Sequence, residues 1–127
     1  MAEFREGYYY AKTHEWVKTE GDLARIGITD YAQSELGDLV YAEANAAGGK
    51  VKKGDTIGAV ESVKMASDIY APVSGEIVES NDTLEDTPEA INENAFETWF
   101  IVIRMSDPAE LEELMDAEAY EKFCAEN

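Results

Sequence analysis

The sequence predicts a mainly β fold, a flattened β-barrel or barrel-sandwich hybrid with short helices. Most of the chain consists of short segments in which apolar and polar residues alternate, separated by turns that contain Gly, Asn or Asp. After residue 106 the apolar spacing becomes helical. A chain of 127 residues with 45% hydrophobic content can bury a core without disulfides or metals, so we expect one domain over residues 1–127.

The first half of the chain predicts a hairpin, a helix and a further strand. Residues 14–29 form the hairpin, with a turn near residues 20–22 and with Ala24, Ile26 and Ile28 directed toward one face. The elements that follow are a helix over residues 30–36 capped by Thr29 or Asp30 and ended by Gly37, a strand over residues 38–44, and a loop over residues 45–55 with a short strand at its end.

The run AVESVKMASDIYAP, residues 59–72, is typical of two short strands with Lys64 at the apex between them. Pro72 cannot donate to a strand ladder, so we expect it at a sheet edge or a bulge, before a turn at residues 74–75. Residues 98–105 are apolar on both faces, which predicts a central strand. A lysine on a tight hairpin tip holds its amine where a modifying enzyme can reach it, although such a tip also simply favours a polar residue.

The C-terminal segment predicts two short helices that pack on the sheet and carry no chemistry. Asp107 is a capping residue, Pro108 takes the first helical position, and Glu110 lies where a capping box has its glutamate. The apolar residues at helical spacing are Leu111, Leu114 and Met115 in the first helix and Tyr120, Phe123 and Cys124 in the second.

The charge of the chain is strongly one-sided. Ten Lys and Arg residues against 28 Asp and Glu residues give a net charge of −18. Such a surface repels nucleic acid and anionic membranes, and it favours partners with basic docking faces, unless the charge serves solubility alone. No apolar run is long enough to span a membrane and no secretory pattern opens the chain, so we expect a cytoplasmic protein or a mature form whose targeting segment was removed.

Residues with catalytic potential are few. His14 is the only histidine and Cys124 the only cysteine, so neither a disulfide, a CxxC motif nor a multi-ligand zinc site can form. A packed, hydrogen-bonded His14 is expected in preference to a catalytic one, and Cys124 is expected in the core in preference to a reactive thiol. No phosphate-binding or metalloprotease motif occurs in the chain.

Several motifs resemble, nearly throughout, the H protein of the glycine cleavage system, a lipoyl carrier. The matching segments are AKTHEWV (residues 11–17), ARIGITDYAQSELGDLVY (24–41), GAVESVK (58–64), SDIYAPVSGEIVESN (67–81) and SDPAELEELMDAEAYEKF (106–123). The resemblance covers about residues 8–124. It implies a lipoyl-domain-like core over about residues 23–105 and C-terminal helices over about residues 107–125.

The resemblance implies a carrier and not an enzyme, with lipoate joined by an amide to Lys64. A lipoate ligase or transferase would attach it, and Glu61 would help that enzyme recognise the hairpin unless it is only a solvated strand residue. The implied partners are a pyridoxal-phosphate glycine decarboxylase, an aminomethyltransferase that serves tetrahydrofolate, and a flavin dihydrolipoyl dehydrogenase. The redox sulfurs then belong to the cofactor. We expect the carrier to be a monomer.

In this family the loaded arm folds into a surface cleft that shelters the aminomethyl group from water. The matching positions in this chain are Thr13, Glu15 and Asp68. The carboxylates of Glu15 and Asp68 are candidates for pairing with the protonated amine, and the alternative is that both are ordinary surface acids.

The chain departs from the family pattern in two places. Met65 replaces a small residue, often alanine, and because methionine beside the lysine is typical of biotin carriers, a biotin carboxyl carrier is an alternative. Residues 93–99, ENAFETW, lack the proline and both glycines of the family's loop and are one residue shorter, which leaves the loop's conformation open. Two further alternatives are an H-like protein that donates lipoate to other enzymes and an interaction domain in which Lys64 stays unmodified.

Overall fold

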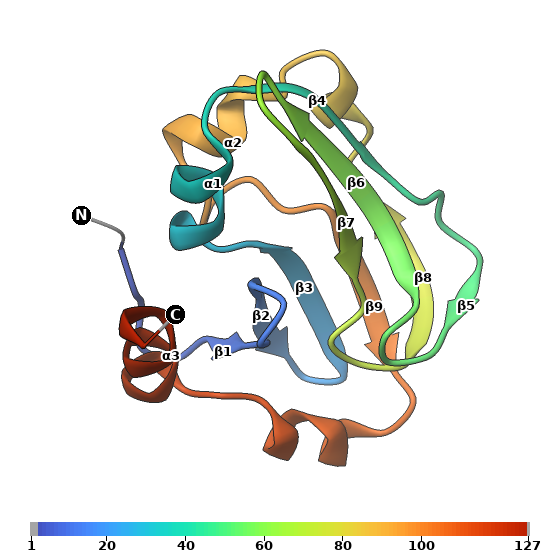
Figure 1. Ribbon diagram of the computed structural model, residues 1–127. Coiled ribbons are helices and arrows are strands. Elements are labelled where there is room, and N and C mark those ends of the chain that lie inside the picture. The colour runs from blue at the N-terminus through green and yellow to red at the C-terminus, as the bar shows by residue number, and fades with distance from the viewer. Residues whose placement is uncertain (1–2, 127) are drawn as a thin grey trace.

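Two antiparallel β-sheets form the body of the protein (Figure 1). The computed structural model describes residues 3–126. One sheet has six strands in the order β1-β2-β3-β9-β8-β5, and the other has three in the order β4-β6-β7. The predicted mainly β class, a flattened barrel-sandwich, is confirmed, although the two sheets do not close into one barrel. The single domain over residues 1–127 stays a prediction, and residues 1, 2 and 127 lie outside the described residues.

The elements follow one another with short connections. The strands are β1 (Tyr9–Tyr10), β2 (Glu15–Glu20), β3 (Leu23–Ile28), β4 (Leu39–Ala44), β5 (Lys50–Val51), β6 (Thr56–Ser62), β7 (Ala66–Tyr70), β8 (Gly75–Ser80) and β9 (Ile101–Met105). The helices are α1 (Asp30–Leu36), α2 (Glu89–Glu93) and α3 (Ala117–Ala125), with 3₁₀ segments η1 (Asp82–Glu85) and η2 (Pro108–Glu113). The sequence did not lead us to expect β1, η1 or α2.

The core forms where the alternating apolar residues of both sheets meet. Ala24 and Ile26 on β3 have no exposed surface and pair with Ile103 and Ile101 on β9. The predicted central position of β9 is confirmed, since it lies between β3 and β8. Val60 on β6 is also fully buried and belongs to the same apolar cluster. Burial of this cluster is the main stabilising contribution to the fold.

Helix α1 begins and ends as its sequence predicts. The Thr29 side chain caps it by accepting a hydrogen bond from Ala32 N at 3.1 Å. The helix ends at Gly37, whose φ of 86° favours glycine because a side chain would be strained there. The next residues lead directly into β4, beside the tip of the β6–β7 hairpin (Figure 1).

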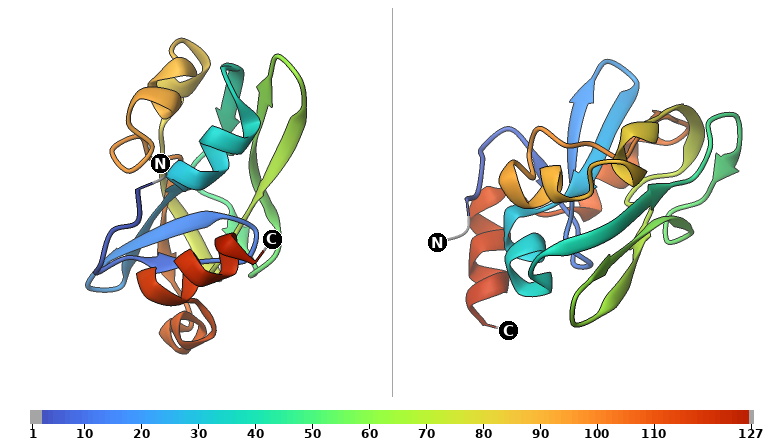
Figure 2. Two further views of the ribbon diagram at one scale, coloured as in Figure 1. Left: turned by 60° about the vertical axis from the view of Figure 1, so that its left-hand side comes forward. Right: turned by 90° about the horizontal axis from the view of Figure 1, so that it is seen from above.

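The C-terminal segment covers one side of the six-stranded sheet, with α3 beside β1 (Figure 2). The predicted cap at Asp107 is confirmed, because its side chain accepts from Ala109 N. The predicted capping box is wrong: the carboxylate of Glu110 turns away from the helix start and accepts from the backbone N and the hydroxyl of Ser74, at 2.7 and 2.8 Å. This bond ties η2 to the turn before β8.

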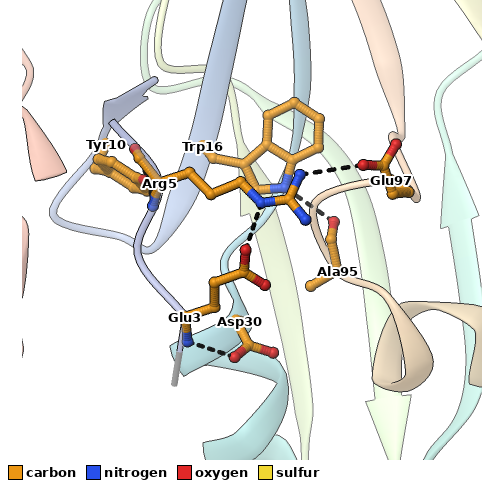
Figure 3. Close-up of polar contacts among 7 residues, drawn as sticks. All are labelled: Glu3, Arg5, Tyr10, Trp16, Asp30, Ala95 and Glu97. Carbon is orange, nitrogen blue, oxygen red and sulfur yellow. Dashed lines mark hydrogen bonds and ion pairs between the residues drawn. The ribbon is translucent and has the colours of Figure 1, made fainter. Parts of the chain in front are cut away.

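The atypical loop after α2 is held by the N-terminal arm, residues 3–8 (Figure 3). Arg5 Nη1 donates to Glu97 at 3.1 Å, and its guanidinium carbon lies 4.8 Å from the centre of the Phe96 ring. Tyr10 anchors the arm itself, because its hydroxyl donates to the carbonyl of Arg5 at 2.7 Å. These contacts answer the question that the sequence left open for this loop.

Candidate functional site

The β6–β7 hairpin carries Lys64 in a connection of three residues, Val63, Lys64 and Met65. The hydroxyl of Ser62 accepts from the backbone N of Lys64 at 3.3 Å and of Met65 at 3.1 Å, and it donates to the carbonyl of Met65 at 3.2 Å. Val63 N donates to Asp38 O at 3.2 Å, which fixes the tip against the start of β4. The backbone around the lysine is therefore held by hydrogen bonds to Ser62 and Asp38.

The Lys64 side chain itself is exposed. Within residues 3–126 its amine takes part in no ion pair, although the chain has 28 acidic residues. A methyl group placed on Gly37 would lie 3.5 Å from Lys64 Cε, so the stem of the lysine lies over the end of α1. The predicted position of Lys64 at an accessible hairpin apex is confirmed by this geometry.

A cavity of about 240 Å³ opens between α1, the loop before β2 and the edge strand β7. Thr13 and Asp68 both line it, as do Tyr31 and Glu35 from α1. Four residues of extended chain separate Lys64 from Asp68, about 13 Å at the rise of a β-strand. A long chain attached to the lysine would therefore reach this cavity.

A second cavity, of about 490 Å³, lies on the other side of Thr13. It is lined by Tyr70 and Pro72 and also by Lys53, whose amine is paired with Glu113 at 2.8 Å. It is larger, but Tyr70 lies about 20 Å along the strand from Lys64. The shorter distance from Lys64 therefore favours the smaller cavity as the place for a group attached to the lysine.

Glu15 lies between the two sheets and not on the surface. Its side chain has 1% of its surface exposed, accepts from the hydroxyl of Thr13, and accepts from Tyr70 N at 3.2 Å. Burial raises the pKa of the Glu15 carboxyl to about 7, against the smaller effect of these hydrogen bonds. Thr13 thus separates the Glu15 carboxyl from the cavity, while Asp68 is exposed at its edge.

The other candidate residues have clear positions. Glu61 is exposed on β6 and pairs in register with Ala66, directly below the tip. His14 is packed and hydrogen-bonded, as expected: its Nδ1 lies 2.7 Å from the hydroxyl of Tyr120, and burial lowers its pKa. Cys124 is buried, also as expected, and burial raises the pKa of its thiol. No cluster of three or more metal-binding side chains occurs within residues 3–126.

Two residues near the tip were missed by sequence reasoning. Ser62 was taken only as part of the segment before the lysine, and Asn92 was not considered. The amide of Asn92 donates to Gly37 O and accepts from Leu39 N, both at 2.9 Å, and so fixes the end of α1 under Lys64. An asparagine in a segment for which the sequence predicts no element carries no signal of such a distant contact.

Comparison with known families gives a match over almost the whole chain. The family model described as glycine cleavage H-protein matches residues 8–127. The chain belongs to the glycine cleavage H-protein family. The resemblance inferred over residues 8–124 is therefore confirmed.

Relatives with the name "Glycine cleavage system H protein" support the assignment. The protein of Oceanobacillus iheyensis is 57% identical over 115 residues, which are 90% of this chain and 91% of the relative. That of Staphylococcus saprophyticus is 52% identical over 118 residues, 92% and 94% of the two chains. A crystal structure of a glycine cleavage system H protein from Mycobacterium marinum superposes with a TM-score of 0.84 at 32% identity, covering 93% of this chain and 96% of that one. No helix in the described part of the chain has the length and apolar character needed to cross a membrane.

Proposed function

We propose that this glycine cleavage H protein carries lipoate as an amide on Lys64 and shuttles the aminomethyl group between the enzymes of the system. The observation that supports the proposal most directly is the exposed, unpaired amine of Lys64 at the apex of a hairpin held by hydrogen bonds to Ser62. An attaching enzyme needs that amine free of ion pairs and clear of the protein body.

The surroundings of Lys64 fit such a group. The lysine stem lies over Gly37, and α1 continues from there into the wall of the 240 Å³ cavity. When bound, lipoate supplies the disulfide that accepts the aminomethyl group. The chain's own thiol, Cys124, lies on α3, where only 7% of the residue's surface is exposed. It is not among the residues that line this cavity, so it does not substitute for the cofactor sulfurs.

We propose distinct roles for the acids near the arm. Asp68 is exposed at the cavity edge, where a carboxylate attracts a protonated amine. Glu15 lies behind Thr13 and would act through it, with Thr13 presenting its hydroxyl oxygen to the amine while remaining bonded to the carboxyl. Glu61 lies on the outer surface beneath the tip, where the attaching enzyme would recognise it.

The proposed partners are a lipoate ligase or transferase, a glycine decarboxylase, an aminomethyltransferase and a dihydrolipoyl dehydrogenase. Of the exposed acids, Asp38 and Glu61 lie next to the tip, and Glu35 and Asp68 line the cavity; they would attract basic docking faces on these enzymes. Tethering the transferred group raises its concentration at each active site without free diffusion. The protein itself would be a monomeric, cytoplasmic carrier and not a catalyst.

Intact mass after incubation with lipoate, ATP and a lipoate ligase tests the attachment. We expect one lipoyl adduct on the native chain, one on Lys52→Arg, and none on Lys64→Arg. Lys52 is a matched control because it is also exposed and lies in the connection between β5 and β6. An adduct on Lys64→Arg, or none on the native chain, contradicts the proposal.

Two further measurements separate the alternatives. A parallel incubation with biotin and a biotin ligase tests the biotin carrier suggested by Met65, since the two adducts differ in mass. Glycine–bicarbonate exchange with purified decarboxylase separates a glycine cleavage carrier from a lipoate donor that serves other enzymes. We expect exchange with the lipoylated native chain and none with Lys64→Arg.

A further inference from the structure

His14 has an unusual backbone between two residues of the proposed cleft, Thr13 and Glu15. Its φ is 74°, the one positive value at a non-glycine residue within residues 3–126. Its N donates to Ala11 O at 2.9 Å and its O accepts from Thr29 N at 3.0 Å, so the chain reverses tightly here. A conformation of this kind is strained for a residue with a side chain and persists only where the surroundings impose it.

The His14 side chain is in contact with the C-terminal helix. Tyr120 on α3 has no exposed surface, and its hydroxyl lies 2.7 Å from His14 Nδ1 and 2.7 Å from the hydroxyl of Thr29. The Thr29 hydroxyl also accepts from Ala32 N, and in its bond with Tyr120 either hydroxyl can be the donor. The tyrosine hydroxyl and His14 Nδ1 are also hydrogen-bonded, and the tautomer of the histidine decides which of the two donates. We call the three side chains of His14, Thr29 and Tyr120 the clasp.

We propose that Tyr120 is a positioning residue for the cleft, because the clasp holds His14 left-handed and thereby keeps Thr13 in the cavity wall with the Glu15 carboxyl enclosed behind it. Helix α3 contributes no residue to the lining of that cavity. It acts on the cleft from outside, through the Tyr120 hydroxyl and through the rings of Tyr120 and Phe123, which contact the His14 ring. The role of the clasp in sheltering an attached group rests on the proposed function, whereas the enclosure of the Glu15 carboxyl does not.

The enclosure of Glu15 gives a direct readout in the unloaded protein. The groups that face its carboxyl are the Thr13 hydroxyl, the Tyr70 amide and the amide of Glu15 itself, none of them charged, and burial is the main cause of its raised pKa. If the turn at His14 relaxes, water reaches the carboxyl and the pKa falls toward its ordinary value of 4.5. Carbon NMR of the carboxyl measures this midpoint.

Tyr120→Phe should lower the Glu15 midpoint by about one unit or more. The matched control is Tyr10→Phe. Tyr10 is equally buried, and its ring stacks on that of Tyr120 at 4.7 Å, but its hydroxyl bonds to the backbone of Arg5 and not to His14. Both variants lose one buried hydroxyl, so we expect similar losses of thermal stability and a changed midpoint in Tyr120→Phe alone. An unchanged midpoint in Tyr120→Phe, or equal shifts in both variants, overturns the proposal.

Substitution of His14 provides a second test that leaves α3 intact. Glycine adopts the left-handed conformation without strain and alanine does not. His14→Gly should therefore keep a Glu15 midpoint closer to the native one than His14→Ala, and adding His14→Gly to Tyr120→Phe should restore part of the shift. The opposite order, or a larger shift in the double variant, contradicts the positioning role.

The lipoylated protein adds a functional readout. Release of ammonia from the aminomethyl-loaded protein should be several times faster in Tyr120→Phe than in Tyr10→Phe, because the cleft no longer excludes water. If the two variants release ammonia at equal rates although the Glu15 midpoint is shifted in Tyr120→Phe, the clasp has only a structural role and its proposed role in the cleft is overturned. If Lys64 accepts no lipoate at all, the proposed function fails, while the midpoints still decide the geometry of the clasp.

Discussion

Replacing Glu15 by Gln should make the protein more stable at neutral pH and change how its stability depends on pH. The carboxyl is 1% exposed and its pKa is raised from 4.5 to about 7, so the folded protein binds a proton that the unfolded chain releases between these values. The contribution of this carboxyl to stability is therefore fully present below about pH 4.5, decreases as the pH rises, and is lost above about pH 7. The shift corresponds to about 3 kcal/mol.

The measurement is urea unfolding of the native chain and of Glu15→Gln, followed by tryptophan fluorescence between about pH 4 and about pH 8. Glutamine fits the site, because its oxygen can accept from Tyr70 N and its amide can donate to the Thr13 hydroxyl oxygen. The free energy of unfolding of the variant minus that of the native chain should increase by about 3 kcal/mol from the acid to the alkaline end of this range. Glu61→Gln, at an exposed position, is the control and should show a constant difference. A constant difference for Glu15→Gln, or one that grows toward acid, refutes the reasoning.

Three further outcomes follow from particular contacts. Gly27→Ala should lower the free energy of unfolding by about 2 kcal/mol, because the new methyl carbon would lie 2.6 Å from the buried Trp16 ring; unfolding equilibria in urea measure it. Ser62→Ala should speed amide exchange at Lys64 and Met65 about fivefold, since their N–H groups lose an acceptor at 3.3 and 3.1 Å; unchanged exchange would mean that the strands alone hold the tip. Raising ionic strength should raise the KM of each partner enzyme for the carrier, and salt-independent kinetics would leave solubility as the only role of the −18 charge.

The sequence predicted those features that depend on local pattern. Alternation around Ile26, the cap at Thr29, the glycine stop at Gly37 and the apex at Lys64 are all set by residues close in the chain, and all were found in the structure. Contacts between distant segments could not be predicted in the same way. The bond from Asn92 to the end of α1 spans more than fifty positions of the chain and leaves no periodic signal.

The candidate site shows the same division. Lys64 was found from its hairpin, but the burial of Glu15 was not foreseen, since an acid next to Thr13 and His14 reads as a surface residue in any local pattern. The capping box at Glu110 failed for a related reason. Its carboxylate accepts from the backbone N of Ser74 before β8, which is distant in the chain, and not from the backbone N of Asp107 as a capping box requires.

The separation of the two sheets explains why polar side chains are so prominent around the cleft. The strands of the two sheets form no common ladder, and β7 is at the edge of the smaller one, so backbone pairing does not set the width of the cavity beside it. The Glu15 carboxyl crosses this gap, from β2 to the Tyr70 amide at the end of β7. Burial of an acid costs free energy, which the raised pKa records. A glutamine would bridge the gap without that cost, but it could not offer negative charge to a cation in the cleft. We therefore propose that the buried acid at this position serves the cargo more than the fold, and the stability gained by Glu15→Gln should be accompanied by weaker retention of the aminomethyl group.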